Sequence, residues 1–155
     1  AVSYYREYYE EKGMFENEVY LGIKQLLRDL TKQGVLCLVA TSKPEIYAKK
    51  ILDYYELSNY FYYIAGANMD GTRTDKAEVI AYALKQIPAE YNNKKVLMVG
   101  DRSHDIIGAK KNGIDCAGVL FGYGSREELE EAGADFVADS VEAVRNIILL
   151  DTAMN

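Results

Sequence analysis

The sequence predicts a doubly wound α/β domain built around a mostly parallel sheet. Short runs that are apolar throughout alternate along the chain with segments whose apolar residues recur at helical spacing. Strands that are apolar on both faces and are separated by helices are typical of a parallel sheet covered on both sides. The chain has 155 residues, and 49% of them are hydrophobic, which is enough to bury the core of one compact domain.

The first half of the chain contains two predicted strands, each followed by a helix. Val35–Ala40 is a short apolar run, and the stretch Glu45–Tyr55 after it has a helical pattern. Phe61–Ala65 is a second apolar run. After a polar loop, a helix is predicted over Lys76–Gln86 from the spacing of its apolar residues, Val79, Ile80, Ala83 and Leu84.

The second half continues the alternation of strands and helices. In chain order the predicted elements are the strand Val96–Val99, a helix carrying Ile106, Ile107 and Ala109, the strand Cys116–Leu120, the short helix Glu127–Ala132, the short strand Phe136–Ala138 and a closing helix Val141–Leu150. At the start of the chain, tyrosines spaced among charged residues predict an amphipathic helix over Ala1–Lys12.

The charge and the hydropathy of the chain argue against nucleic-acid and membrane partners. The formal net charge of −6 argues against a nucleic-acid partner, because phosphate backbones select basic surfaces. No apolar run approaches the length that crosses a bilayer, and no signal-peptide pattern opens the chain. We therefore expect a cytoplasmic protein without a membrane partner. Cys37 and Cys116 each lie in an apolar run and are expected to be buried thiols rather than a disulfide.

Candidate functional residues follow the predicted strands, since ligands of doubly wound sheets lie beyond the carboxyl ends of the strands. Thr41 and Ser42 follow the first strand, where hydroxyl and backbone N–H groups can hold a phosphate oxygen. The same residues can instead cap the next helix. Lys76 begins a predicted helix, where a cation is unfavourable unless an anion lies nearby. It is therefore a candidate phosphate clamp, with a solvated surface lysine as the alternative.

A pair of acids follows the third strand, in the string GDRSHD at residues 100–105. Asp101 lies at the strand end and Asp105 one turn into the helix, so both can face one site. Hard oxygen ligands of this kind suit Mg²⁺, which keeps several waters and takes few protein carboxylates. Helix capping is the alternative, but one cap needs only one carboxylate. Between the acids, Arg102 either contacts the substrate or pairs with a nearby acid, and His104 is expected to face solvent.

Taken in order, these residues resemble the motifs of the haloacid dehalogenase superfamily. Thr41 matches the second motif, a strand ending in Thr or Ser, and Lys76 matches the third, a lysine at a helix start. The string at 100–105 matches the fourth motif, Gly-Asp-x-x-x-Asp. Together with ATSKP at 40–44 and DGTRTDK at 70–76, it resembles the phosphoglycolate phosphatase and 5′-nucleotidase-like branch.

The resemblance implies a Mg²⁺-dependent phosphomonoester hydrolase that acts on a small phosphorylated metabolite through an aspartyl-phosphate intermediate. It implies that Thr41 and Ser42 bind phosphoryl oxygens and that Lys76 pairs with the phosphate. It also implies that Asp101 holds the metal ion, and that Asp105 belongs to the metal site, where it orients a bound water or Lys76.

The family's first motif, Asp-x-Asp-Gly-Thr, carries the nucleophile, and no such motif precedes Thr41. The nearest string, NMDGT at 68–72, has asparagine at the nucleophile position and lies between the second and third motifs, so we interpret it as a turn. We therefore expect residues 1–13 to be a remnant of a helical cap domain. Residues 14–155 are expected to form a core without its central first strand, which leaves two unpaired strand edges. Such a chain alone is expected to be inactive. A noncatalytic phosphate- or metal-binding domain is the alternative function.

Overall fold

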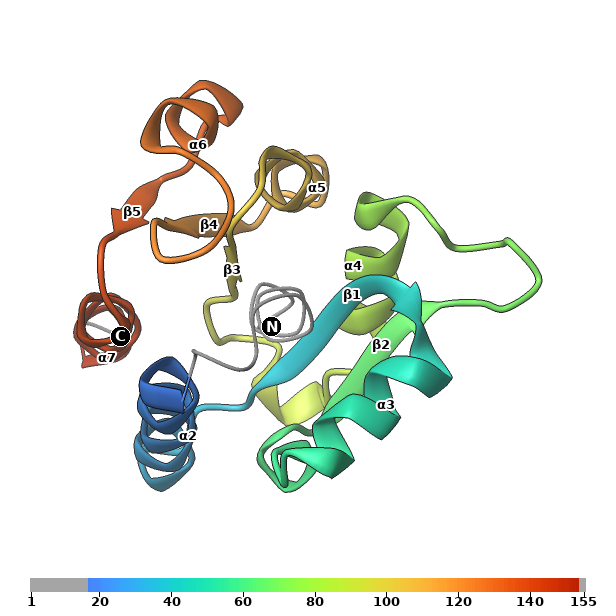
Figure 1. The fold of residues 1–155 in the computed structure, drawn as a ribbon, viewed down its shortest axis with the longest axis horizontal. Helices are drawn as coiled ribbons and strands as arrows, with labels where there is room; N and C mark the ends of the chain where they lie inside the picture. The colour runs from blue at the N-terminus through green and yellow to red at the C-terminus, as the bar shows by residue number, and fades with distance from the viewer. Residues whose placement is uncertain (1–16, 154–155) are drawn as a thin grey trace.

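The computed structural model describes residues 17–153, in which strands and helices alternate as the sequence predicts (Figure 1). The helix expected over Ala1–Lys12 and the cap remnant expected at residues 1–13 lie outside the described residues. In chain order the elements are α2 Asn17–Lys32, β1 Leu38–Pro44, α3 Glu45–Tyr54, β2 Tyr63–Ala67, α4 Lys76–Lys85, β3 Leu97–Gly100, α5 Ser103–Lys111, β4 Asp115–Val119, α6 Arg126–Ala132, β5 Phe136–Ala138 and α7 Val141–Ala153, with short 3₁₀ helices at Ser58–Tyr60 and Ala89–Tyr91.

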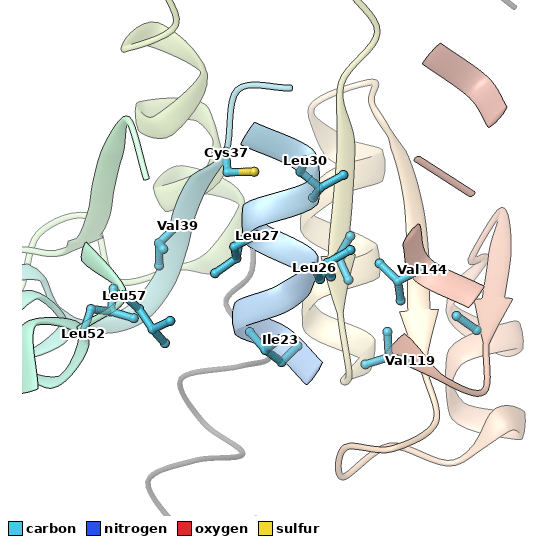
Figure 2. Packing of buried hydrophobic residues seen from close by; sticks show 12 residues of the cluster. Ile23, Leu26, Leu27, Leu30, Cys37, Val39, Leu52, Leu57, Val119 and Val144 are labelled. Carbon is cyan, nitrogen blue, oxygen red and sulfur yellow. The ribbon is translucent and has the colours of Figure 1, made fainter. Parts of the chain in front are cut away.

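Helix α2 is absent from the elements predicted above. Its buried residues Ile23, Leu26, Leu27 and Leu30 recur at the i, i+3, i+4, i+7 spacing of an amphipathic helix. They belong to one hydrophobic cluster (Figure 2). This spacing is the signal in the sequence for the helix, and burial of its apolar stripe in this cluster is what stabilises it.

All strand pairs among the described residues are parallel, which confirms the α/β fold class. β1 pairs with β2, β3 pairs with β4 and β4 pairs with β5. These pairings form two sheets, β1–β2 and β3–β4–β5, and within the described range β1 and β3 do not pair with each other. The division lies where a core without its central first strand is expected to be interrupted.

Helices cover both faces of the strands, as in a doubly wound fold. Val39 of β1 and Val99 of β3 belong to a cluster with residues of α2, α3 and α7. Ala40 and Met98, their neighbours in the chain, belong to a second cluster with residues of α4, α5 and α6. Because successive side chains of a strand point to opposite faces, the two clusters are the two sides of the domain.

An apolar cavity of about 270 Å³ lies between the two sheets. Its lining includes Leu38 and Ala40 of β1, Leu97 and Val99 of β3, and Ile23 and Leu27 of α2. Each of the two flanking strands has a strand neighbour on one side only among residues 17–153. The cavity therefore has apolar walls and lies between two open strand edges, as a position for one more strand would.

The structure also bears on two expectations from composition. Cys37 and Cys116 are buried free thiols, as expected, and burial raises the pKa of each. In the part of the chain that the structure describes, no helix combines the length and the apolar character that a membrane span requires.

Replacing Leu52 by alanine should destabilise the fold. Leu52 of α3 is fully buried in the first cluster (Figure 2), and truncating such a leucine to alanine costs about 2–5 kcal/mol. Urea denaturation followed by circular dichroism measures the change. Leu150→Ala is the control, because Leu150 is 66% exposed and its truncation should cost less than about 0.5 kcal/mol. Equal losses in the two variants would contradict the described packing.

Candidate functional site

The predicted site residues lie at the carboxyl ends of β1 and β3, which belong to different sheets, and in the first turns of α4 and α5. β1 extends to Pro44, so that Thr41 and Ser42 lie within its last part. Asp101 directly follows β3, and Lys76 is the first residue of α4. The carboxyl ends of the strands are where an α/β domain gathers its ligands.

A buried ion pair joins the beginnings of α4 and α5. Lys76 Nζ lies 2.8 Å from Asp105 Oδ1, and the two side chains are only 3% and 1% exposed. The alternative of a solvated surface lysine is therefore wrong for Lys76. A buried ion pair is stable only where close contact and further hydrogen bonds offset the lost hydration.

The surroundings of Asp105 favour its ionised form. Burial, the largest single influence, raises the pKa of the carboxyl, but the charge and hydrogen bond of Lys76, nearby His104 and the backbone N–H of Arg102 together hold it below its usual range. Asp105 Oδ2 accepts hydrogen bonds from the backbone N–H of Asp101 at 3.1 Å and of Arg102 at 3.2 Å. One oxygen therefore holds Lys76 and the other holds the loop after β3.

Gly100 allows Asp105 to approach the end of β3. A Cβ atom at this position would lie 2.4 Å from the Cβ and 2.5 Å from the Oδ2 of Asp105, well inside the contact distance of two heavy atoms. Only glycine fits here without displacing the carboxylate.

Asp101 is also fully buried and is held by the loop between β4 and α6. Its Oδ2 accepts a hydrogen bond from the backbone N–H of Tyr123 at 2.8 Å, and its carbonyl oxygen accepts one from Gly124 N at 2.9 Å. Its backbone N–H bonds to the Asp105 carboxylate, which in turn contacts Lys76. These connected residues carry two buried carboxylates and one buried ammonium, so negative charge exceeds positive charge. Residues 17–153 contain no cluster of three or more His, Cys, Asp or Glu arranged for a metal. Because Mg²⁺ keeps several waters and needs few protein carboxylates, this donor set fits Mg²⁺.

Thr41 and Ser42 do not cap the next helix. The N-cap residue of α3 is Pro44, and no side-chain hydrogen bond caps that helix. Thr41 is fully buried, and its Oγ1 accepts a hydrogen bond from Lys43 N at 3.2 Å within the turn that ends β1. The capping alternative is therefore wrong for these two residues.

A pocket of about 420 Å³ opens between β1, α4 and α5. Ser42, Lys76 and His104 line it together, so it collects polar side chains from all three elements. His104 is 45% exposed and lies 3.7 Å from Asp105 Oδ1, as expected for a solvent-facing helix residue. Thr41 and Asp101 are not among the described residues that line the pocket.

Arg102 pairs with an acid, which was one of its two expected roles. Its Nε donates a hydrogen bond to Glu128 Oε2 at 3.0 Å, and the same oxygen accepts one from Ser103 N at 2.7 Å. The bond from Ser103 and then the bond from Arg102 hold the pKa of Glu128 below its usual range. No local sequence pattern predicts that Glu128, Tyr123 and Gly124 contact this loop, because the partners lie more than twenty residues apart in the chain.

Residues 2–119 match the family model described as haloacid dehalogenase-like hydrolase. The chain belongs to this family. The resemblance carried by the motifs is thus confirmed. The chain is 39% identical over 150 residues to a 5′-nucleotidase of Pseudomonas aeruginosa, covering 96% of this chain and 66% of that protein. It is 38% identical over 151 residues to tyrosine-protein kinase PtkA of Mycobacterium tuberculosis, covering 96% of this chain and 51% of the kinase.

A solved structure shares the fold. The crystal structure of a predicted phosphatase from Clostridium acetobutylicum superimposes with a TM-score of 0.76 at 41% identity, covering 96% of this chain and 68% of that chain. The chain spans about half to two thirds of the length of the two curated relatives (51% and 66%). These relatives are named for different activities, so membership of the family does not by itself select one reaction.

Replacing Lys76 by methionine should strongly destabilise the domain. The change leaves Asp105 buried without its cation, and loss of one partner of a buried pair costs about 3–5 kcal/mol. Urea denaturation at pH 7 measures the loss. Lys111→Met is the control, since exposed Lys111 lines the same pocket.

The double variant Lys76→Met/Asp105→Asn extends this test. Because the amide carries no charge, the double variant should be more stable than Lys76→Met alone. If Lys76→Met costs no more than Lys111→Met, the ion pair contributes nothing to the fold.

Proposed function

We propose that this chain supplies the phosphate- and metal-binding part of a Mg²⁺-dependent phosphomonoester hydrolase. One observation carries the proposal: Lys76, Asp105 and Asp101 are all buried, and the Asp105 carboxylate contacts both the ammonium of Lys76 and the backbone N–H of Asp101. The lysine can bind an anion such as phosphate, and a carboxylate can bind a divalent cation. The proposed substrates are small phosphorylated metabolites, such as a nucleoside monophosphate or phosphoglycolate. Similarity to a 5′-nucleotidase supports this class.

The phosphoryl group would be held by residues of β1 and α4. Lys76 Nζ would pair with one oxygen, and the Thr41 hydroxyl and the backbone N–H of Ser42 would donate hydrogen bonds to others. Asp105 holds the lysine side chain in place through its 2.8 Å contact. Such fixed donors stabilise charge that develops in the transition state without having to reorganise.

Asp101 is the residue that would hold the metal ion. When bound, Mg²⁺ would offset the negative charge of the phosphate and of the attacking carboxylate. Asp105 was expected in the metal site, either holding the ion or orienting its neighbours. Because both of its oxygens are engaged with Lys76 and the loop, we assign it to orientation. Arg102 pairs with Glu128, and we assign it to the loop rather than to the substrate.

The nucleophile would come from a segment N-terminal to these residues. An aspartate there would attack phosphorus and form an aspartyl phosphate, a second acid would protonate the departing alcohol, and water would then release phosphate. The cavity between β1 and β3 is the proposed position of the strand that carries this aspartate. Its carboxyl end would then lie between the ends of β1 and β3. The chain alone would bind phosphate and metal without turnover.

A version of the protein extended with its upstream sequence should release phosphate from small phosphomonoesters in the presence of Mg²⁺. Chelation with EDTA, or the change Asp101→Asn, should lower kcat by about 10²–10³-fold, because charge stabilisation in the transition state is lost. A phosphate-release assay over a panel of substrates measures both effects. The 155-residue chain should show no release.

Asp115→Asn is the matched control for Asp101→Asn, since Asp115 is exposed at the opposite end of its strand, and it should retain full activity. Phosphate release that persists after chelation and in Asp101→Asn would overturn the proposed function. Transfer of phosphate from ATP to tyrosine, without hydrolysis of monoesters, would instead assign this chain the activity named for its kinase relative.

Amide hydrogen exchange tests the proposed strand position. A strand between β1 and β3 would bond to the open edges of both, so amides in residues 38–40 and 97–99 should exchange about tenfold or more slowly in the extended protein than in this chain. β4 already has strand neighbours on both sides, and its amides should change little. Equal exchange at β1 and β3 in the two proteins would place the upstream segment elsewhere.

A further inference from the structure

Glu128 connects the first turn of α6 to the loop that carries Asp101. Its Oε2 accepts hydrogen bonds from Ser103 N at 2.7 Å and from Arg102 Nε at 3.0 Å. Ser103 is the first residue of α5, and an N–H group at that position has no partner within its own helix. Glu128 therefore supplies, from a different helix, an acceptor that the beginning of α5 needs.

Glu128 lies at a position in α6 where a glutamate usually caps its own helix. Ser125 is the N-cap residue of α6, and its Oγ accepts a hydrogen bond from Glu128 N at 3.1 Å. A glutamate three residues after such a serine commonly reaches back to the N–H of the cap residue. Here the carboxylate accepts a hydrogen bond from Ser103 N of α5. It therefore connects two helices that are distant in the chain.

The same segment holds Asp101 through its backbone. Tyr123 N donates to the carboxylate of Asp101 and Gly124 N donates to its carbonyl oxygen. A Cβ at Gly124 would lie 2.1 Å from that carbonyl oxygen, so the two backbones are in direct contact. Together, Tyr123, Gly124 and Glu128 form hydrogen bonds with three successive residues, 101–103.

We propose that Glu128 is a positioning residue of the metal site, which sets the affinity for the divalent cation by fixing the direction of the Asp101 carboxylate. It would contact neither metal nor phosphate and would act through Ser103 and Arg102. The inference rests on the proposed function, in which Asp101 holds Mg²⁺. Residues that orient metal ligands in this way typically change metal affinity by about 10–100-fold when replaced.

Mg²⁺ titration of phosphate release by the extended protein tests the role of Glu128. Glu128→Ala removes both acceptor contacts and should raise the Mg²⁺ concentration at half-maximal rate by about tenfold or more, with the rate recovering toward wild type at saturating Mg²⁺. Glu128→Gln keeps an oxygen for Ser103 N but loses the ion pair with Arg102, and should give an intermediate shift.

Glu130→Gln is the matched control. Glu130 is exposed on the same helix and pairs with Arg126 of that helix, so its half-saturating Mg²⁺ concentration should equal that of the wild type. A purely structural role for Glu128 would lower the melting temperature and the folded fraction without moving the half-saturating concentration. That result would overturn the proposal, and Glu128→Gln provides the comparison if Glu128→Ala does not fold.

Calorimetric titration with Mn²⁺ in the absence of substrate gives a second readout that does not depend on turnover. Glu128→Ala should weaken Mn²⁺ binding by about the same factor, and Glu130→Gln should not. If the wild type needs no divalent cation and Asp101→Asn is fully active, the proposed function fails. If both behave as proposed while Glu128→Ala binds Mn²⁺ and responds to Mg²⁺ like the wild type, only the role of Glu128 fails.

Discussion

The buried contact between Lys76 and Asp105 is the constraint on which the rest of the site depends. Two opposite charges that lose their water are stable only at short range and with their remaining hydrogen-bonding groups used. Here the charged atoms are 2.8 Å apart, and the other carboxylate oxygen accepts two backbone hydrogen bonds. The beginnings of α4 and α5 and the end of β3 are thereby fixed relative to one another, because a shift of either helix would leave a charge buried alone.

The ion pair also determines the chemistry that this edge of the domain offers. Asp105 neutralises Lys76 and holds it at the helix N-terminus, where an anion would be favoured. Asp101 adds a second buried carboxylate, which favours a cation. A phosphate beside Lys76 and a divalent cation beside Asp101 would each meet a group of opposite charge. Membership of the haloacid dehalogenase-like hydrolase family is consistent with this pairing, and the proposed hydrolase activity uses it.

The site is shared between two sheets that have no strand pairing among the described residues. β1 supplies Thr41 and Ser42, and Asp101 follows β3. The hydrophobic core rather than a hydrogen-bond ladder holds these halves together: Leu26 and Leu27 of α2 belong to one cluster with residues of both β1 and β3 (Figure 2). The apolar cavity between the sheets means that the two halves are joined through helices. A strand in that position would connect them directly, which links the proposed source of the nucleophile to the rigidity of the site.

Local sequence determined the order of strands and helices and the residue types at the strand ends, since an apolar run or a helical period depends on neighbours a few positions away. It also identified Lys76, Asp101 and Asp105 as candidates, because Asp101 follows a strand and the other two lie in the first turn of a helix. Tertiary structure alone decided that Lys76 is buried against Asp105, that Thr41 does not cap α3, and that Arg102 is held by α6. These outcomes depend on helices that are distant in the chain and meet only when the core packs. A charged group that loses its water on packing must then pair with an opposite charge within contact distance.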